Sequence, residues 1–159
     1  MALKELTEEF LAQKRIAVVG VSRSKQDAAN LIYRKLRDVG YEVFAVNPNA
    51  EQVEGDVCYS SVGAIPGGVT GVVIVTRPEI TETVVADCAE SGVSYVWIHN
   101  NPFARGHSSV SARAVQICLE NGIKVIPGVC PLMYCQPVDF GHKCMRWLLD
   151  IAGKSPKGN

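Results

Sequence analysis

A short run of glycine, hydroxyl-bearing and basic residues follows the first apolar segment of the chain. Backbone N–H groups at the start of a helix attract anions, and hydroxyl groups and cationic side chains beside them add to that attraction. The run therefore predicts a phosphate-binding turn. The alternative is a tight glycine turn with solvated cations, because fragments of a glycine-rich fingerprint are weak signals by themselves. The residues of the run are Gly20, Val21, Ser22, Arg23, Ser24 and Lys25.

The turn departs from the glycine patterns of known nucleotide sites. Ser22 stands where the dinucleotide fingerprint has its second glycine and Lys25 where it has the third, and the turn lacks the Gly-Lys-Ser/Thr of a P-loop. A nicotinamide site also needs an Asp or Glu at the end of the second strand, but Asn47 and Pro48 occupy that place. NAD is therefore a poor fit. A NAD(P)-dependent oxidoreductase, with Arg23 near a 2′-phosphate, is kept as an alternative.

Two proline loops follow later apolar segments. Asn47 and Pro48 end the second segment, and Thr76, Arg77 and Pro78 end the third. The proline rings offer apolar surfaces for an adenine, and the arginine adds a cation for a phosphate. Together with the glycine turn, these loops predict a nucleotide site. Taken singly, a proline more often marks only a turn or the start of a helix.

These loops belong to a chain in which short apolar, β-branched segments alternate with amphipathic ones, the pattern of βαβ units. Several of the apolar segments suit strands that are covered on both faces of a parallel sheet. We expect an α/β fold, a Rossmann-like doubly wound sheet of about five parallel strands with flanking helices, whose ligands bind beyond the carboxyl ends of the strands. The expected strands are Ile16–Val19, Glu42–Val46, Gly71–Val75, Ser94–Ile98 and Lys124–Ile126.

Apolar residues at helical spacing predict the helices. Leu31 is among the residues that mark the first of them, and Ile80 is expected to point inward from the second. The C-terminal helix, which carries Trp147, is expected to pack on the domain or on a partner. We expect one domain over residues 1–152 and a flexible tail over 153–159. The expected helices cover residues 28–39, Pro78–Ser91, Ser109–Gly122 and Phe140–Ile151, besides a helical pattern within Met1–Arg15.

The overall composition excludes several classes of protein. Among 159 residues, 16 Lys and Arg balance 16 Asp and Glu, so the chain lacks the cationic surplus of a general nucleic-acid binder. No apolar run of about 18 residues is present to cross a bilayer. The six cysteines show neither a disulfide framework nor paired metal knuckles. We expect a cytoplasmic protein with no nucleic-acid or membrane partner.

An ordered series of segments carries a family resemblance. The segments are Val18–Ser22, Gly40–Val43, Val46–Pro48, Val75–Pro78, Val96–Ile98 and Gly128–Pro131. The series resembles the small stand-alone CoA-binding domain proteins, which are similar to the CoA-binding domain of the succinyl-CoA synthetase α subunit. The resemblance spans about residues 10–135. It implies a Rossmann-like fold that binds coenzyme A, with no established reaction for the stand-alone proteins.

The resemblance also implies a set of site residues. The glycine turn of the family falls on residues 20–22, followed by Ser24 and Lys25 as phosphate contacts, and its other loops fall on residues 47–48 and 76–78. Coenzyme A carries a 3′-phosphate and a diphosphate, so it needs several cations. It has no use for the ribose-binding acid that the chain lacks.

One loop departs from the family pattern. After the fourth strand the family usually has a Gln and a glycine-rich turn, whereas this chain has a longer polar loop from His99 to His107. Loops at the ligand edge of a sheet often specify what is bound. We therefore include His99 and Asn100 among the candidate contacts for the pantetheine arm or another ligand. The alternative is a surface loop with solvated histidines.

Cys130 follows the fifth strand at the same edge, so it is a further candidate contact. A thiol near cations or a helix N-terminus would have a lowered pKa and react as a thiolate, whereas a thiol that fills a tight turn would be inert. A zinc site is not expected, because the spacing of the nearby candidates is not that of a zinc knuckle. Those candidates are Cys130, Cys135, His142 and Cys144.

The sequence thus predicts a protein that binds coenzyme A or an acyl-CoA through its 3′-phospho-ADP moiety at the carboxyl edge of the sheet. It predicts no catalytic residues, because no Ser-His-Asp order, carboxylate pair or nucleophile elbow is present. In the synthetase that the chain resembles, the catalytic phosphohistidine lies in a second domain, so we expect no ligase activity from residues 1–159. A protein-interaction module with vestigial nucleotide binding is a second alternative. A homodimer through the apolar C-terminal helix is a possible arrangement.

Overall fold

Seven strands form a single sheet within the described part of the chain, which in this computed structural model comprises residues 2–104, 106 and 108–154. Six strands run parallel, and β3 pairs antiparallel with β4 at one edge. The strands are β1 (Arg15–Val19), β2 (Glu42–Val46), β3 (Gln52–Val53), β4 (Asp56–Tyr59), β5 (Gly71–Ile74), β6 (Tyr95–His99) and β7 (Lys124–Val129).

The order of the strands is that of a doubly wound sheet. It runs β3-β4-β2-β1-β5-β6-β7, so the chain reverses direction across the sheet between β1 and β5. The prediction of an α/β, Rossmann-like fold is confirmed, and the five expected strands are present. The hairpin of β3 and β4 was not predicted. A doubly wound sheet forms a crevice where the strand order reverses, beyond the carboxyl ends of the strands.

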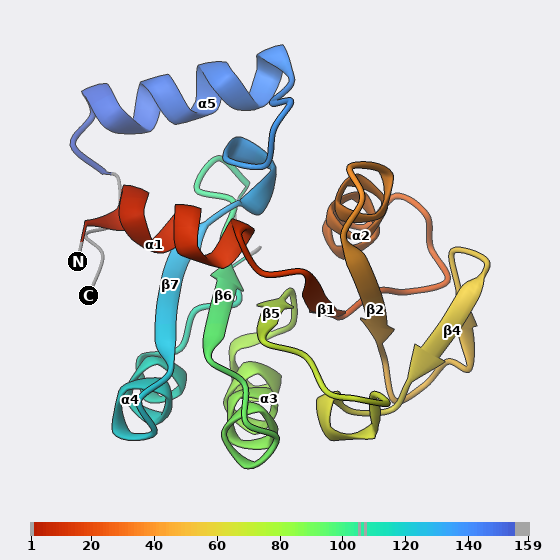
Figure 1. The fold of residues 1–159 in the computed structure, drawn as a ribbon. Coiled ribbons are helices and arrows are strands. Elements are labelled where there is room, and N and C mark those ends of the chain that lie inside the picture. Colours follow the sequence, from red (N-terminus) through yellow and green to blue (C-terminus); the bar gives the residue numbers. More distant parts are fainter. Residues whose placement is uncertain (1, 105, 107, 155–159) are drawn as a thin grey trace.

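Helices cover both faces of the sheet (Figure 1). Helices α1 and α2 lie on one face and α3 and α4 on the other, whereas α5 lies farther out on the side of α1. The helices are α1 (Leu3–Leu11), α2 (Ala28–Asp38), α3 (Pro78–Glu90), α4 (Ala112–Glu120) and α5 (Phe140–Ile151), with 3₁₀ turns η1 (Val62–Ala64) and η2 (Pro131–Met133).

Strand β1 shows why the sheet lies in the middle. Its side chains point alternately to the two faces. Ile16 and Val18 belong to the core beneath α1 and α2, whereas Ala17 and Val19 belong to the core above α3 and α4. All four are buried. A strand that is apolar on both faces can only be stable between two layers of helices, which fixes the carboxyl end of β1 at the centre of the molecule.

Two predicted helix faces differ from the structure. Leu31 of α2 and Ile80 of α3 are 43% and 45% exposed, although both were assigned to apolar faces. The buried positions of α3 are Thr81, Val85 and Cys88, which follow one another at helical spacing, and Ile80 lies just beside that row. Periodicity finds a helix more reliably than it finds the edge of its buried stripe.

Gly20 and Gly40 have similar backbone angles but different surroundings. Comparing alanine substitutions at the two positions therefore distinguishes the cost of backbone strain from the cost of a steric clash. Gly20 and Gly40 have φ of +104° and +101°, but a Cβ on Gly20 would lie 2.1 Å from the Val75 carbonyl oxygen, whereas nothing lies within 4 Å at Gly40. We expect Gly40→Ala to cost about 1–2 kcal/mol from backbone strain and Gly20→Ala to cost at least about 2 kcal/mol more. Chemical denaturation measures both. Equal losses would show that the close approach at Gly20 is easily relaxed.

Candidate functional site

The carboxyl ends of β1, β2 and β5 surround a cavity of about 630 Å³. Three predicted loops meet there, since Gly20, Asn47, Pro48, Thr76 and Arg77 all line it. Its other lining residues provide an apolar wall and a polar rim. The wall consists of Val19, Val46, Val62, Ile80 and Val84, and the rim of Asn49, Ser60, Ser61, Thr83 and Asp87.

Asn47 joins two of these loops. Its Nδ2 donates to the carbonyl oxygen of Val21 at 3.0 Å, and its Oδ1 accepts from the backbone N–H of Asn49 at 2.9 Å. The backbone N–H of Gly20 donates to the carbonyl oxygen of Val46 at 2.9 Å. The amide of Asn47 is thus already bonded within the protein, so its role is to hold the glycine turn against the proline loop.

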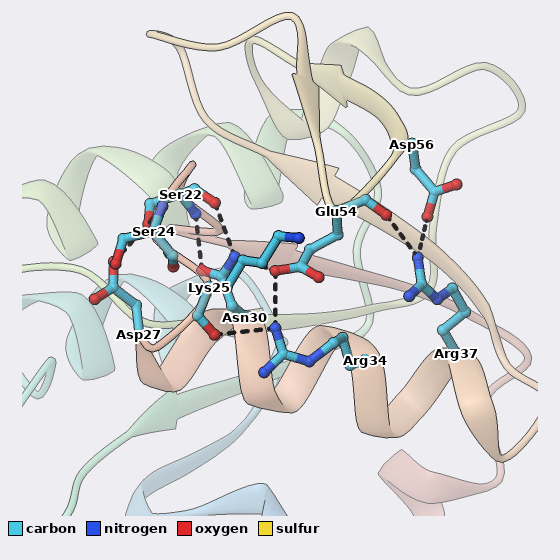
Figure 2. A network of polar contacts seen from close by, with 9 residues as sticks. All are labelled: Ser22, Ser24, Lys25, Asp27, Asn30, Arg34, Arg37, Glu54 and Asp56. Atoms are coloured by element: carbon cyan, nitrogen blue, oxygen red, sulfur yellow. Dashed lines mark hydrogen bonds and ion pairs between the residues drawn. The ribbon is translucent and has the colours of Figure 1, made fainter.

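A second asparagine, Asn30 of α2, forms hydrogen bonds to the backbone of the turn. Its side chain is fully buried. The Oδ1 of Asn30 accepts from the backbone N–H of Ser22 at 3.0 Å, and its Nδ2 donates to the carbonyl oxygen of Ser22 at 2.8 Å. The same Nδ2 donates to Glu54 Oε1 at 2.7 Å. Because buried polar groups are stable only when bonded, this pairing fixes the backbone of the turn at Ser22 (Figure 2).

Glu54 brings the β3–β4 hairpin into this network. It occupies the turn between the two strands with φ of +54°, and its carboxylate also accepts from Arg34 at 2.9 Å. The Asn30 hydrogen bond and the Arg34 cation hold the pKa of Glu54 below its usual value, against the effect of desolvation. Neither Asn30 nor Glu54 was predicted as part of the site. The sequence did contain one indication of the role of Asn30, because this polar residue falls on the side of α2 that is otherwise apolar and buried.

An acidic side chain lies beside the predicted phosphate turn. The Ser22 hydroxyl donates to Asp27 Oδ2 at 2.5 Å, and Ser22 Oγ accepts from the backbone N–H of Ser24 at 3.0 Å (Figure 2). Asp27 is the N-cap residue of α2. A carboxylate therefore lies at the end of the helix where a phosphate would be attracted. The Ser22 hydroxyl is bonded to this carboxylate in the ligand-free protein.

The remaining residues of the turn differ in their exposure to solvent. Val21 is buried in the core, whereas Arg23, Ser24 and Lys25 are exposed and line none of the cavities at this edge. The carbonyl oxygen of Lys25 accepts from Arg34 at 3.0 Å. The structure thus brings the glycine of the predicted turn into the cavity wall but leaves its two cations at the surface.

Among the described residues, Arg77 is the arginine or lysine that lines the cavities at this edge. It is the N-cap residue of α3, with Pro78 in the first turn, and it lines both the large cavity and a neighbouring one of about 220 Å³. Thr76 is held by bonds on both sides, because its N–H donates to Ser109 Oγ at 3.0 Å and its hydroxyl lies 2.9 Å from that of Thr81. The loop is therefore rigid where Arg77 projects.

His99 lies at the end of β6, on the other side of Gly20. It is 3% exposed and lines the cavity of about 220 Å³ and another of about 420 Å³. Gly20 lines both the 420 Å³ cavity and the large one. Asn100 lines neither of these cavities, and its backbone forms an isolated antiparallel bridge with Ser108. His107, named in the sequence analysis, lies outside the described residues.

Cys130 lies away from the cavities at the carboxyl edge, which favours the alternative of an inert thiol that fills a turn. The residue is 5% exposed, packs with Met133 and Leu149, and lines none of the three cavities at the carboxyl edge. Burial raises the pKa of its thiol to about 11, so a thiolate is disfavoured. The chain turns away from the edge at Cys130 because η2 begins directly after it.

The structure also bears on a metal site, a membrane-spanning helix and a second cavity. Within residues 2–104, 106 and 108–154, no three His, Cys, Asp or Glu side chains gather in a group that could hold a metal ion. In the same part of the chain, no helix has the length and apolar character needed to span a membrane. A cavity of about 640 Å³ lies at the opposite, amino edge of the sheet and is lined by none of the predicted site residues.

Comparison with known proteins identifies a family match. The family described as CoA binding domain matches residues 14–136, which contain every loop of the carboxyl edge but not α5. The uncharacterized protein YneT of Bacillus subtilis is 29% identical over 126 residues, covering 79% of this chain and 88% of YneT. Acetate–CoA ligase (ADP-forming) II of Archaeoglobus fulgidus is 28% identical over 117 residues. That match covers 70% of this chain but only 17% of the ligase.

Solved structures show the same fold. A hypothetical protein from Pyrococcus horikoshii OT3 has a TM-score of 0.74 and 27% identity, covering 82% of this chain and 87% of the other. The apo form of the dinucleotide-forming acetyl-coenzyme A synthetase 1 of Ca. Korarchaeum cryptofilum has a TM-score of 0.63 and 27% identity. That match covers 72% of this chain and 26% of the synthetase. The chain therefore corresponds to about a quarter of that enzyme.

The link between Glu54 and the turn makes stability depend on pH. A carboxyl group whose pKa is lowered by folding stabilises the fold above its usual pKa of 4.5, and this contribution disappears as the pH falls through the folded value. We expect Glu54→Gln to lower the free energy of unfolding at pH 7 by about 1 kcal/mol. The deficit should shrink as the pH falls below about 4.5.

Urea denaturation of the wild type and variant between pH 3 and 7 measures this dependence. Glu51→Gln, a change at an exposed position directly before β3, is the matched control and should leave the curve unchanged. A Glu54→Gln deficit that is the same at every pH would contradict the assignment.

Proposed function

The chain belongs to the CoA-binding domain family, and we propose that it binds coenzyme A or an acyl-CoA at the carboxyl edge of its parallel sheet. The observation that carries the proposal is the cavity in which Gly20, Pro48 and Arg77 converge from three separate loops. It lies where the strand order reverses, the place at which doubly wound sheets bind nucleotides.

In this proposal the 3′-phospho-ADP moiety occupies the large cavity. The adenine lies against the apolar surfaces of Pro48, Val62 and Ile80, and the Arg77 guanidinium pairs with a phosphate. Asp87, the acid of this cavity, already accepts the backbone N–H of Val62 at 2.8 Å. The cavity therefore offers apolar surface and a cation, which suit a phosphorylated adenosine.

The pantetheine arm then passes Gly20 toward the cavities that His99 lines. Gly20 lines both the large cavity and the cavity of about 420 Å³, so the two cavities meet at this residue. His99 and the loop around Asn101 and Ala104 supply the contacts at that end. A nicotinamide dinucleotide suits the site less well, because Asn47 stands in place of the ribose-binding acid and its amide is already bonded.

We further propose that this chain binds its ligand without a reaction of its own. The ligases among its relatives are several times longer, and the chain covers only 17% of the one from Archaeoglobus fulgidus. A cytoplasmic location fits the proposal, since all six cysteines are free thiols. The single-domain organisation over residues 1–152 is part of the same proposal.

The cation that faces the cavity should control affinity. Arg77→Ala removes a charge-assisted hydrogen bond to a phosphate, so we expect the Kd for coenzyme A to rise about 10- to 100-fold. Isothermal titration calorimetry with coenzyme A, dephospho-CoA, NADH and NADPH measures the effect. Arg113→Ala, an exposed arginine on α4 that pairs with Glu120, is the control. Tight binding of NADPH without binding of coenzyme A would favour the oxidoreductase alternative and contradict this proposal.

The acid at the start of α2 should oppose an anionic ligand. Asp27→Asn removes the negative charge while keeping a good N-cap residue, so we expect the Kd for coenzyme A to fall about threefold to fivefold. Asp38→Asn, at the other end of the same helix, should leave the Kd unchanged. Affinities measured at two salt concentrations test the cause, because the gain should shrink at high salt. Weaker binding by Asp27→Asn would show that the carboxylate positions the ligand instead.

A further inference from the structure

Helix α5 exposes a row of large apolar side chains. Phe140, Trp147, Leu148 and Ile151 are 82%, 62%, 47% and 65% exposed, and Leu149 is the buried residue of the helix. A contiguous row of this kind marks an interaction surface far more often than scattered apolar residues do. The row is also outside the matched family domain, which ends at residue 136.

The spacing of the row is that of a coiled-coil seam. Phe140, Cys144, Trp147 and Ile151 are separated by steps of four, three and four residues, the alternation that keeps one stripe facing a partner helix. Leu149 lies nine positions after Phe140, which at about 100° per residue places it on the opposite side of the helix. That side packs against Cys130 and Met133. The contact with the domain and the exposed seam therefore occupy different faces.

Figure 1 shows that α5 lies at the periphery, beyond α1, so that none of the other described helices and strands covers its outer side. The seam is short, about two heptads, and it needs a partner of the same shape. The charges that flank it indicate which partner. Lys143 and Asp150 are exposed and lie seven residues apart on the same flank of the seam.

We propose that α5 pairs antiparallel with α5 of a second copy of this chain about a two-fold axis. In an antiparallel pair the same flank of both helices meets, so Lys143 of each copy faces Asp150 of the other. In a parallel pair this flank would meet the opposite one, which carries Leu148 and Gly141 and offers no charge. The pattern of charges is therefore self-complementary only in the antiparallel arrangement.

Sedimentation equilibrium of the whole chain over a range of concentrations tests the interface. We expect a monomer–dimer equilibrium that Trp147→Glu abolishes. Leu119→Glu, which alters an apolar residue of α4 that is 52% exposed, is the matched control and should leave the dimer intact. Circular dichroism shows that both variants are folded. A wild type that is monomeric at every concentration, or a dimer that survives Trp147→Glu, would overturn the proposal.

A charge exchange tests the orientation. Lys143→Glu and Asp150→Lys should each weaken dimerisation about tenfold, because each creates two like-charge pairs across the interface. The double variant restores both pairs with opposite polarity and should bring the dimer Kd back to within about threefold of the wild type. Additive losses in the double variant would rule out the antiparallel pairing.

A lipid surface is the other partner that an exposed apolar row could have. Co-sedimentation of a monomeric chain with vesicles of phosphatidylcholine and phosphatidylserine would assign the row to such a surface and overturn the proposal.

Discussion

The backbone of Gly20 lies so close to the carbonyl oxygen of Val75 that a Cβ would approach it to 2.1 Å. This approach brings the ends of β1 and β5 together at the point where the strand order reverses. Because no side chain separates them there, the wall between the large cavity and the His99 cavities is only a strip of backbone. The close approach of these two strand ends therefore depends on glycine at position 20.

The geometry at Gly20 is held by two asparagines that act on the backbone after it. Asn47 bonds the carbonyl of Val21, and Asn30 bonds both backbone groups of Ser22. Through Glu54, Asn30 also connects the turn to the β3–β4 hairpin, which Arg37 ties to α2 by its bond to Asp56 at 2.8 Å. The amides of Asn30 and Asn47 are therefore used to hold the backbone of the site in place. The groups that line its cavities include Arg77, His99 and apolar side chains.

Much of this arrangement was predictable from the sequence. The alternation of apolar and amphipathic segments indicated the parallel strands and the loops that follow them, because periodicity and turn residues are local properties. The convergence of Gly20, Pro48 and Arg77 then followed from the topology of a doubly wound sheet. The predicted bounds of the C-terminal helix were also correct, since α5 covers Phe140–Ile151.

The parts that escaped prediction depend on contacts between distant residues. The hairpin of β3 and β4 has strands of two and four residues, too short for a pattern. The bond of Asn30 to Glu54 spans 24 positions, and no local rule pairs them. Cys130 was placed correctly at the end of β7, but its burial comes from Leu149 of α5, which a loop-based argument does not consider. The Asp27 bond to Ser22 spans only five positions, but it places a carboxylate beside a turn that was predicted from its cations alone.

The central claim is that coenzyme A lies at the carboxyl edge of the sheet. Amide chemical-shift mapping by ¹H–¹⁵N NMR during titration with coenzyme A tests it most directly. The account predicts that the largest shifts fall on Gly20, Ser22 and Arg77, and that Ala104 moves with them. Shifts concentrated instead on Lys14, Tyr41 and Gln136, which line the cavity of about 640 Å³ at the amino edge, would contradict it.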